Sequence, residues 1–340
     1  MRRTFREWLN RRRAEAGGQV DVVYTWVDGD DPEFRRSFQR YASAPQSTTA
    51  AGARRFRDSD ELRFSLRSLE AYVPWAGRVF LVPNGQVPRW LRRDHPRLQL
   101  VRHQDIFRDT SHLPTFNSAA IEAQLHRIPG ISRLFLYLND DFFFGRPVAR
   151  DQFVTADGRP RLWVDAWELP FGDEDKDDLA VQWLVHAREL LTAALGQRRL
   201  ASPIHGPIVL DRKALGRVES RWRRDFARTS ASRFRVGRMA MPHVLYVHWL
   251  AARGGCDLSV NTAEHCSFVM FQPPLARVEQ ELDELRRIRP LCFCINDDWD
   301  DAPQAKADLL RSFLEDCFPR ASSFETDGPA PAVRSRGGAM

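Results

Sequence analysis

The sequence contains no long hydrophobic run. Stretches without a polar residue, such as Leu134–Leu138, are about five residues long, whereas a membrane-spanning helix needs about 20 apolar residues. The basic amino terminus leads into Gln19-Val20-Asp21 and not into an apolar segment, which is unlike a secretory signal peptide. We therefore expect a chain that works in the cytoplasm.

Cysteine pairs with C-x-x-C spacing are also absent. The five cysteines are an odd number, and Cys256, His265 and Cys266 lack a fourth ligand at a regular spacing, so we expect no zinc site. Cys292 and Cys294 lie two residues apart in an apolar run and are expected to be small core residues on one face of a strand. Five cysteines without a regular spacing fit a protein of a reducing compartment.

Net positive charge is small outside the amino terminus, because basic and acidic residues nearly balance there. Residues 1–13 hold six Arg and one Glu, which is most of the net charge of +6. The basic groove that nucleic acid would require is therefore not expected. We interpret residues 1–19 as a basic arm that is either solvated or in peripheral contact with an anionic membrane.

Alternating strand and helix patterns predict an α/β fold with a mostly parallel sheet. The expected strands are Val20–Val27, Val79–Val82, Leu98–Val101, Leu134–Leu138 and Leu291–Ile295. Asp58 and Glu61 have the spacing of a capping box that opens a helix, and further helices are expected at 114–128, 177–195, 214–227, 277–289 and 302–318. Residues 319–340 are rich in small residues and proline, and we expect them to be a disordered tail.

Two predicted strands end in the same tripeptide, Asn139-Asp140-Asp141 and Asn296-Asp297-Asp298. Adjacent carboxylates repel each other unless a cation compensates them, and Mg²⁺ typically binds one or two carboxylates together with substrate phosphates. The alternative is an acidic turn that faces water. Since ligands gather at the carboxyl ends of strands in open α/β sheets, we expect the site there.

His205 lies between Pro203 and Pro207, in a segment whose backbone is restricted. A histidine on a rigid turn is suited to general base catalysis, although a lone histidine more often has a structural role. Arg57, Arg63 and Arg235 have the fork geometry that binds phosphate oxygens.

Four segments taken together resemble the Stealth family. Asp21–Gly29 is similar to the first signature region of that family, and Arg57–Ser68 to the start of the second. The remaining segments, in order, are Leu113–Glu122 and Leu136–Asp141 for the second region, His205 with Ser232–Arg235 for the third, and Cys292–Asp298 for the fourth.

The resemblance implies a GT-A-like Rossmann core over residues 20–318, with a helical insertion at about 150–290. It also implies a UDP-sugar donor, a polysaccharide or glycolipid acceptor, and Mg²⁺ or Mn²⁺. Carried over residue by residue, the donor site would comprise Asp28, Gly29, Arg57, Asp58, Glu61, Arg63 and Asn117. The metal site would comprise Asp140, Asp141, Asn296 and Asp297, and the catalytic residues would be His205, Asp141 and Arg235.

The reaction implied by the resemblance is the transfer of a sugar-1-phosphate to a glycan hydroxyl with release of UMP, in capsule or cell-wall synthesis. One alternative is a glycosyltransferase that moves the sugar alone and releases UDP. Another is a non-catalytic protein of polysaccharide or membrane assembly. Carboxylate spacing does not separate the first two reactions, because both use the same donor and metal.

Overall fold

The computed structural model describes residues 18–42, 56–172, 178–271, 274–296 and 303–329. Residues 1–17 of the predicted basic arm, the segment 43–55 and the predicted metal ligand Asp297 lie outside the described residues.

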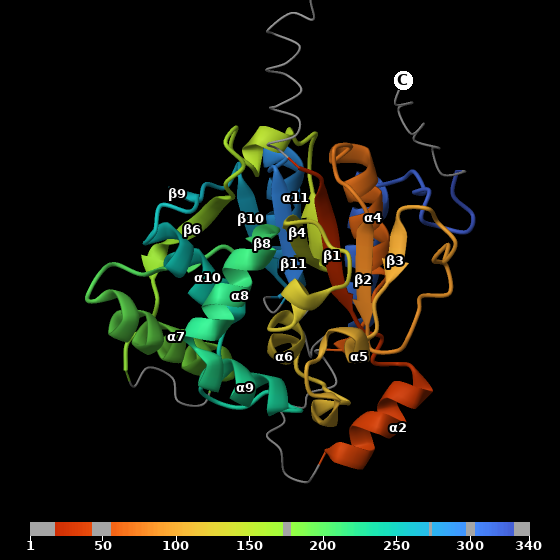
Figure 1. Ribbon diagram of the computed structural model, residues 1–340. Coiled ribbons are helices and arrows are strands. Elements are labelled where there is room, and N and C mark those ends of the chain that lie inside the picture. Colours follow the sequence, from red (N-terminus) through yellow and green to blue (C-terminus); the bar gives the residue numbers. More distant parts are fainter. Residues whose placement is uncertain (1–17, 43–55, 173–177, 272–273, 297–302, 330–340) are drawn as a thin grey trace, which may run out of the picture.

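A five-stranded sheet forms the centre of the molecule, in the order β3-β2-β1-β4-β8 (Figure 1). β1 to β4 run parallel, and β8 is antiparallel to β4. The strands are β1 (Val20–Trp26), β2 (Val79–Pro83), β3 (Leu98–Leu100), β4 (Leu134–Asn139) and β8 (Ile208–Asp211). The order 3-2-1-4 is that of the Rossmann fold, so the predicted α/β core is confirmed.

Both faces of this sheet are covered, which explains why its strands are apolar at nearly every position. Val23 of β1 packs into the core cluster that contains residues of α7, α8 and α10. Its neighbours Val22 and Tyr24 pack against the other cluster, which contains Leu62, Leu66 and Leu69 of α4. These helices are α4 (Glu61–Tyr72), α7 (Leu179–Leu195), α8 (Arg212–Arg221) and α10 (Pro242–Ala251).

A second sheet joins two segments that are distant in sequence. Its strands are β10 (Cys266–Met270), β11 (Cys292–Asn296) and β5 (Phe142–Phe144). β5 begins directly after Asp141 and pairs antiparallel with β11, with Phe142 opposite Cys294. The ends of β4 and β11 are thereby brought together. Helices α11 (Leu275–Ile288) and α12 (Pro303–Cys317) share a core cluster with Phe143 and Phe293 of this sheet.

The predicted helical insertion at 150–290 is wrong in part, because this region also contains strands of all three sheets. β6 (Arg161–Glu168), β7 (Ala201–Pro203) and β9 (Asp257–Val260) form the third sheet, while β8 joins the first and β10 the second. All of these strands except β6 are three to five residues long, which is too short to give a clear periodic pattern. The other helices are α2 (Pro32–Tyr41), α5 (His103–Ile106), α6 (Ser118–Glu122) and α9 (Arg223–Ala231).

Three predicted helices differ from those observed. The helix expected at 114–128 is reduced to α6 and a 3-10 turn at Leu125–Arg127. That expected at 214–227 is divided at Trp222 into α8 and α9. α4 begins at Glu61 and not at Asp58, because Asp60 takes a left-handed conformation with φ 68°. Asp58 Oδ1 instead accepts a hydrogen bond from the Asp60 amide.

The expectation of a disordered tail is wrong for residues 319–329. Phe324 and Glu325 are completely buried, and the Glu325 carboxylate binds Arg63 and Arg67 of α4. Arg92 donates to the Glu325 carbonyl oxygen at 3.0 Å. The buried ion pair of Glu325 with Arg63 and Arg67 holds this segment in place. The expectation of disorder rested on amino-acid composition, which does not reveal such a contact.

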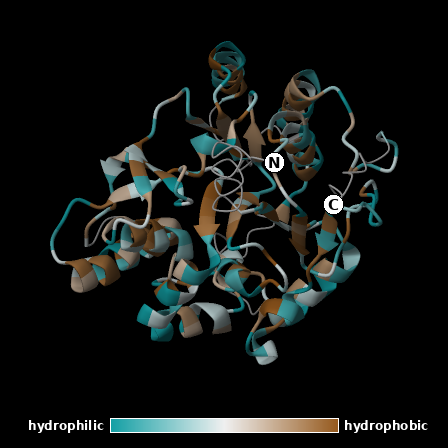
Figure 2. Cartoon of the chain, turned by 45° about the horizontal axis from the view of Figure 1, so that its top comes forward, coloured by the Kyte–Doolittle hydropathy of each residue, from teal (hydrophilic) through white to brown (hydrophobic). Residues whose placement is uncertain are grey.

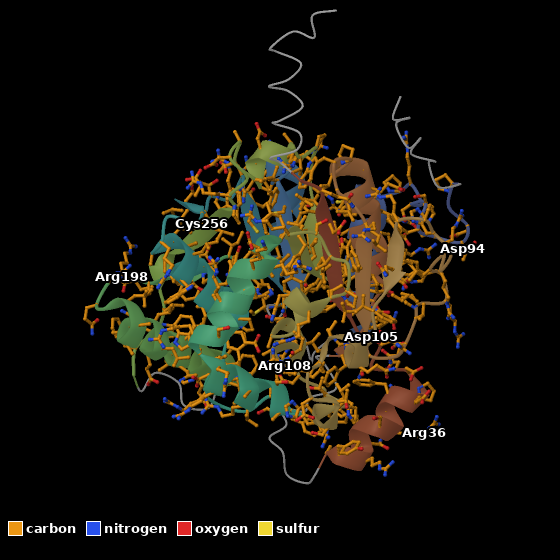
Figure 3. All side chains as sticks on the ribbon, in the orientation of Figure 1. Arg36, Asp94, Asp105, Arg108, Arg198 and Cys256 are labelled. Atoms are coloured by element: carbon orange, nitrogen blue, oxygen red, sulfur yellow. The ribbon has the colours of Figure 1, made fainter. Side chains whose placement is uncertain are left out.

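Apolar residues concentrate in the central strands, while hydrophilic residues dominate the loops and outer helix faces (Figure 2). Charged side chains such as Arg36, Asp94, Asp105, Arg108 and Arg198 point outward (Figure 3). No helix in the described part of the chain is long and apolar enough to cross a membrane.

Candidate active site

A cavity of about 1490 Å³ opens at the carboxyl ends of β1, β2 and β4. Its wall includes Thr25 and Trp26 of β1, Asn84 after β2, and Asn139 of β4. Ligand pockets are commonly about 300–1,000 Å³. This cavity is therefore large enough for two substrates at once.

One wall of the cavity is acidic. Asp140 and Asp141 follow β4, and Asn296 ends β11 on the same wall. The Ile295 amide donates to the Asp141 carbonyl oxygen at 3.2 Å, which ties the two strand ends together. The oxygen atoms of two carboxylates and one amide are the donors that a hard cation prefers, so these residues fit Mg²⁺ or Mn²⁺.

Asn139 is oriented by the hydroxyls of Tyr137 and Thr25. Tyr137 donates to Asn139 Oδ1 at 2.7 Å, and Thr25 donates to the same oxygen at 3.3 Å. Asn139, the last residue of β4, is therefore held by Tyr137 of the same strand and by Thr25 of the neighbouring strand β1. The acidic turn follows directly after it.

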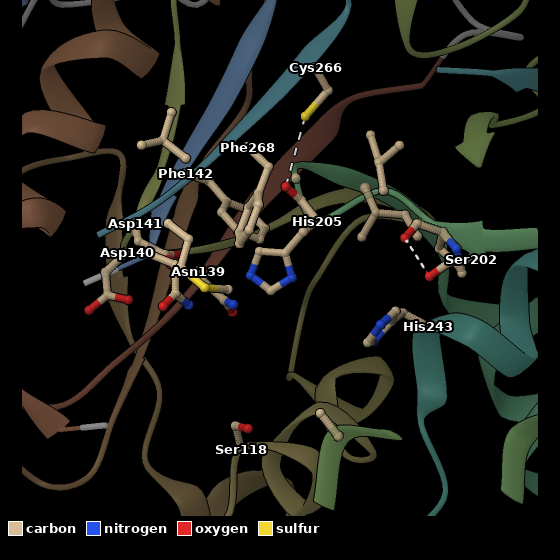
Figure 4. A pocket seen from close by; sticks show the side chains of 18 of the residues that line it. Ser118, Asn139, Asp140, Asp141, Phe142, Ser202, His205, His243, Cys266 and Phe268 are labelled. Carbon is tan, nitrogen blue, oxygen red and sulfur yellow. Dashed lines mark hydrogen bonds between the residues drawn. The ribbon is translucent and has the colours of Figure 1, made fainter. Parts of the chain in front are cut away.

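His205 belongs to the turn from β7 to β8 and lies between the acidic wall and the opposite side of the cavity (Figure 4). The rings of Phe142 and Phe268 contact it edge to face, with centroids 5.2 and 5.3 Å away. Although the ring faces the open cavity, the protein packed around it lowers the pKa of His205 to about 4, helped by the nearby His243 and Arg235. The imidazole is therefore neutral at pH 7.

The opposite side holds a pair that the sequence did not reveal. His243 Nδ1 lies 3.1 Å from Glu122 Oε2, and both residues line the cavity. Figure 4 shows the carboxylates of Asp140 and Asp141 on one side of the His205 ring and His243 on the other. His243 is the second residue of α10, after Pro242, which indicates the start of the helix but not a functional histidine.

Arg235 and Asn117, which the resemblance assigns to catalysis and to donor binding, are among the residues that line the cavity. Arg235 Nη2 donates to Ser118 Oγ at 2.8 Å, and its guanidinium lies over the Trp183 ring, 5.5 Å from the centroid. Asn117 is completely buried, and its Nδ2 donates to the Ser232 carbonyl oxygen at 2.9 Å. Its Oδ1 is also buried and has no hydrogen-bond partner among the described residues.

Arg57 and Glu61 also line the cavity. Glu61 is buried, and Oε2 accepts a hydrogen bond from the Ser59 amide at 2.5 Å. Its carboxylate therefore stabilises the turn before α4 as well as facing the cavity.

Four residues predicted to bind the donor do not line the cavity. Arg63 points to Glu325. Asp28 is held through its backbone by the Gln86 side chain. Gly29 packs so closely on Phe56 that a Cβ atom would lie 2.4 Å from the Phe56 oxygen. Asp58 binds the Asp60 amide, and burial together with the charges of Asp60 and Asp28 raises the pKa of its carboxyl to about 7.

The fold and the site define an α/β protein of the Rossmann type with a large cavity at its strand ends. Models of four conserved regions of Stealth proteins match the chain: region 1 at residues 18–44, region 2 at 55–162, region 3 at 204–252 and region 4 at 283–335. The chain belongs to the Stealth family, as its motifs predict.

Curated relatives include the exopolysaccharide phosphotransferases SCO6023 of Streptomyces coelicolor, 38% identical, and CpsY of Mycobacterium tuberculosis strain H37Rv, 34% identical. Each alignment covers 90% of this chain, but only 52% and 58% of the relatives, so the chain spans little more than half of their length. Among solved structures, the galactosyltransferase LgtC, in complex with donor and acceptor sugar analogues, is 13% identical with a TM-score of 0.42, over 87% of this chain and 96% of LgtC.

Proposed function

We propose that this chain transfers a sugar-1-phosphate from a UDP-sugar to a hydroxyl of a polysaccharide or glycolipid, with release of UMP. The relatives named exopolysaccharide phosphotransferases support the reaction class. The observation that carries the proposal is the single cavity with Asp140 and Asp141 on one wall and the His243–Glu122 pair on the other. Such a cavity places a charged donor opposite a group able to accept a proton.

The donor diphosphate belongs beside the acidic wall. Asp140, Asp141 and Asn296 would hold Mg²⁺ or Mn²⁺, which supplies charge neutralisation at the phosphate oxygens. Arg235, held by Ser118, and Arg57 add positive charge that binds phosphate oxygens.

The acceptor hydroxyl belongs beside His243. Because a carboxylate only accepts hydrogen bonds, Glu122 selects the tautomer in which His243 Nδ1 carries the proton and Nε2 is free to act as a base. The hydroxyl oxygen bonds to the phosphorus next to the donor sugar, its proton passes to His243 Nε2, and the bond from phosphorus to the UMP oxygen breaks. General base catalysis of this kind typically raises the reaction rate by about 10²–10⁴-fold. Positioning of the hydroxyl against the phosphorus raises the rate further.

This assignment moves the base from His205, the expected residue, to His243. His205 is within 4.8 Å of Asp141 and is packed between two phenylalanine rings. His243 has a carboxylate that orients it, which is the arrangement that makes a histidine an effective base.

The nucleotide that is released tests the proposal. The protein is incubated with a panel of UDP-sugars, a glycan acceptor, and Mg²⁺ or Mn²⁺, and the nucleotides are separated. We expect UMP, with a phosphodiester signal in the product that resists phosphatase. Stoichiometric UDP and a product without phosphorus would show that only the sugar is moved.

We also propose that the arginines of residues 1–13 give peripheral contact with anionic membranes. Replacing the six arginines with glutamine should abolish binding to anionic vesicles at low salt. Unchanged binding would contradict this role.

A further inference from the structure

Three side chains with different donor atoms meet at the edge of the cavity. Asp141 belongs to the turn from β4 to β5, His205 to the turn from β7 to β8, and Cys294 to the middle of β11. One carboxylate oxygen, one ring nitrogen and the sulfur lie within 4.8 Å of one another. The Cys294 thiol donates to Asp141 Oδ2 at 3.3 Å.

The backbone fixes each of the three positions. Cys294 stands opposite Phe142 in the pairing of β11 with β5, so the residue before Phe142 is held beside it. The Phe142 and Phe268 rings orient the imidazole. Gly206 lets the turn approach the sheet, since a Cβ there would lie 2.6 Å from Cys266 Sγ.

This combination of atoms is unlike a magnesium site. Mg²⁺ and Ca²⁺ take oxygen ligands, whereas one thiolate, one imidazole and one carboxylate are ligands of Zn²⁺ and Co²⁺. Around Zn²⁺, bonds of about 2.0–2.3 Å in a tetrahedron place the ligand atoms roughly 3.3–3.8 Å apart. The present separations, none above 4.8 Å, exceed that range by about 1 Å at most.

We propose that Asp141, His205 and Cys294 form a site for a transition metal of the Zn²⁺ or Co²⁺ type, with one carboxylate oxygen of Asp141 on this ion and the other left for the Mg²⁺ or Mn²⁺ ion proposed above. The thiol gives its proton to solvent as the metal–sulfur bond forms, and no redox change is involved. The thiol is completely buried, but Asp141 and His205 line the cavity, which provides the entry path. Three protein ligands leave the fourth tetrahedral position open toward the cavity, as in catalytic zinc sites.

Cobalt absorption tests this site without any substrate. Co²⁺ is added to the full chain kept reduced with a phosphine, and the sulfur-to-cobalt charge-transfer band is recorded in the near ultraviolet. We expect the band to reach its maximum at one equivalent and to disappear when Zn²⁺ is added. Cys317→Ser, which removes a thiol at the end of α12 that is not one of the three ligands, should keep the band, whereas Cys294→Ser should lose it.

Because serine at a buried position can lower stability, His205→Ala at an exposed position provides a second variant. It keeps the sulfur and should weaken Co²⁺ binding at least tenfold, with an unchanged circular dichroism spectrum. No band in the folded wild-type protein, or a band that persists in Cys294→Ser, would overturn the proposal. The cobalt experiment involves neither donor nor acceptor, so the absence of the band would not contradict the proposed transferase reaction. Release of UDP in place of UMP would likewise not contradict the proposed metal site.

Discussion

His243 Nδ1 lies 3.1 Å from Glu122 Oε2, although the two residues are 121 positions apart in the chain. Glu122 is the last residue of α6, and His243 lies in the first turn of α10. The pair joins two helices on the side of the cavity that faces the acidic wall. It is the arrangement that the proposed base requires.

The first prediction concerns this pair. His243→Ala should lower kcat by about 10²–10⁴-fold, because the proton of the attacking hydroxyl loses its acceptor. Glu122→Gln should have a smaller effect, since the tautomer is less well fixed but the base remains. The donor KM should change little in both variants, as expected for groups that act in the transition state. Steady-state kinetics test this, and a rise in donor KM with unchanged kcat would contradict the assignment.

Asp141→Asn should abolish transfer while the fold is kept. The amide keeps the size of the side chain but removes the charge that a hard cation needs. Activity is measured at saturating Mg²⁺ and Mn²⁺, with circular dichroism as the control for folding. A variant with near wild-type turnover would remove Asp141 from the proposed metal site.

Arg57→Ala and Arg63→Ala should differ in their effect on donor binding. Arg57 lines the cavity, whereas Arg63 is paired with Glu325. We therefore expect Arg57→Ala to raise the donor KM about tenfold or more, in keeping with a loss of roughly 1.5–3 kcal/mol for a charged hydrogen bond. Arg63→Ala should leave KM unchanged at temperatures where the protein is folded. A raised donor KM in Arg63→Ala together with an unchanged donor KM in Arg57→Ala would instead place Arg63 in the donor site.

Glu325→Ala should destabilise the fold strongly. Its buried carboxylate binds Arg63 and Arg67 and accepts a hydrogen bond from the Ser322 amide at 2.7 Å. Removing one partner of a buried ion pair costs about 3–5 kcal/mol. Asp327→Ala is the matched control, because Asp327 contacts Arg63 at 3.3 Å but is 67% exposed, and its loss should cost less than about 1 kcal/mol. Equal unfolding free energies in urea for the two variants would refute this prediction.

Acidification from pH 8 to pH 5 should lower the free energy of unfolding, in part through His103. Burial lowers the pKa of His103 to about 4, whereas an exposed histidine has a pKa of about 6.5. At pH 5 the unfolded chain therefore binds a proton that the folded protein does not, and the contribution is about 2 kcal/mol. His103→Leu should reduce the stability difference between the two pH values by about this amount. An unchanged difference would show that His103 titrates normally.

The main elements of the central sheet were predictable because their signals are local. Val20–Trp26 and Leu134–Asn139 are apolar runs that end in turn residues, so both the strands and the polar groups that follow them can be identified. Short strands such as Ala201–Pro203 carry no such pattern, and they are stabilised by pairing with β6, far away in sequence.

The candidate site was predictable only where one segment carries it. Asp140 and Asp141 are adjacent in sequence, and a family motif includes them. The His243–Glu122 pair depends on how α6 and α10 pack, and Glu325 reaches Arg63 from 262 positions away. Such contacts arise from tertiary packing and leave no periodic signal.

The pairing of β11 with β5 has a consequence for how this region can vary. Cys294 stands opposite Phe142 and Cys292 opposite Phe144, and successive side chains of a strand point to opposite faces. Inserting or deleting a single residue between Ile288 and Cys292 would turn Cys294 away from Asp141 and put Phe293 or Ile295 in its place. Substitutions on the outer face of α11 leave that pairing intact. We therefore expect natural variants to preserve the length of this connection more strictly than the identity of its side chains.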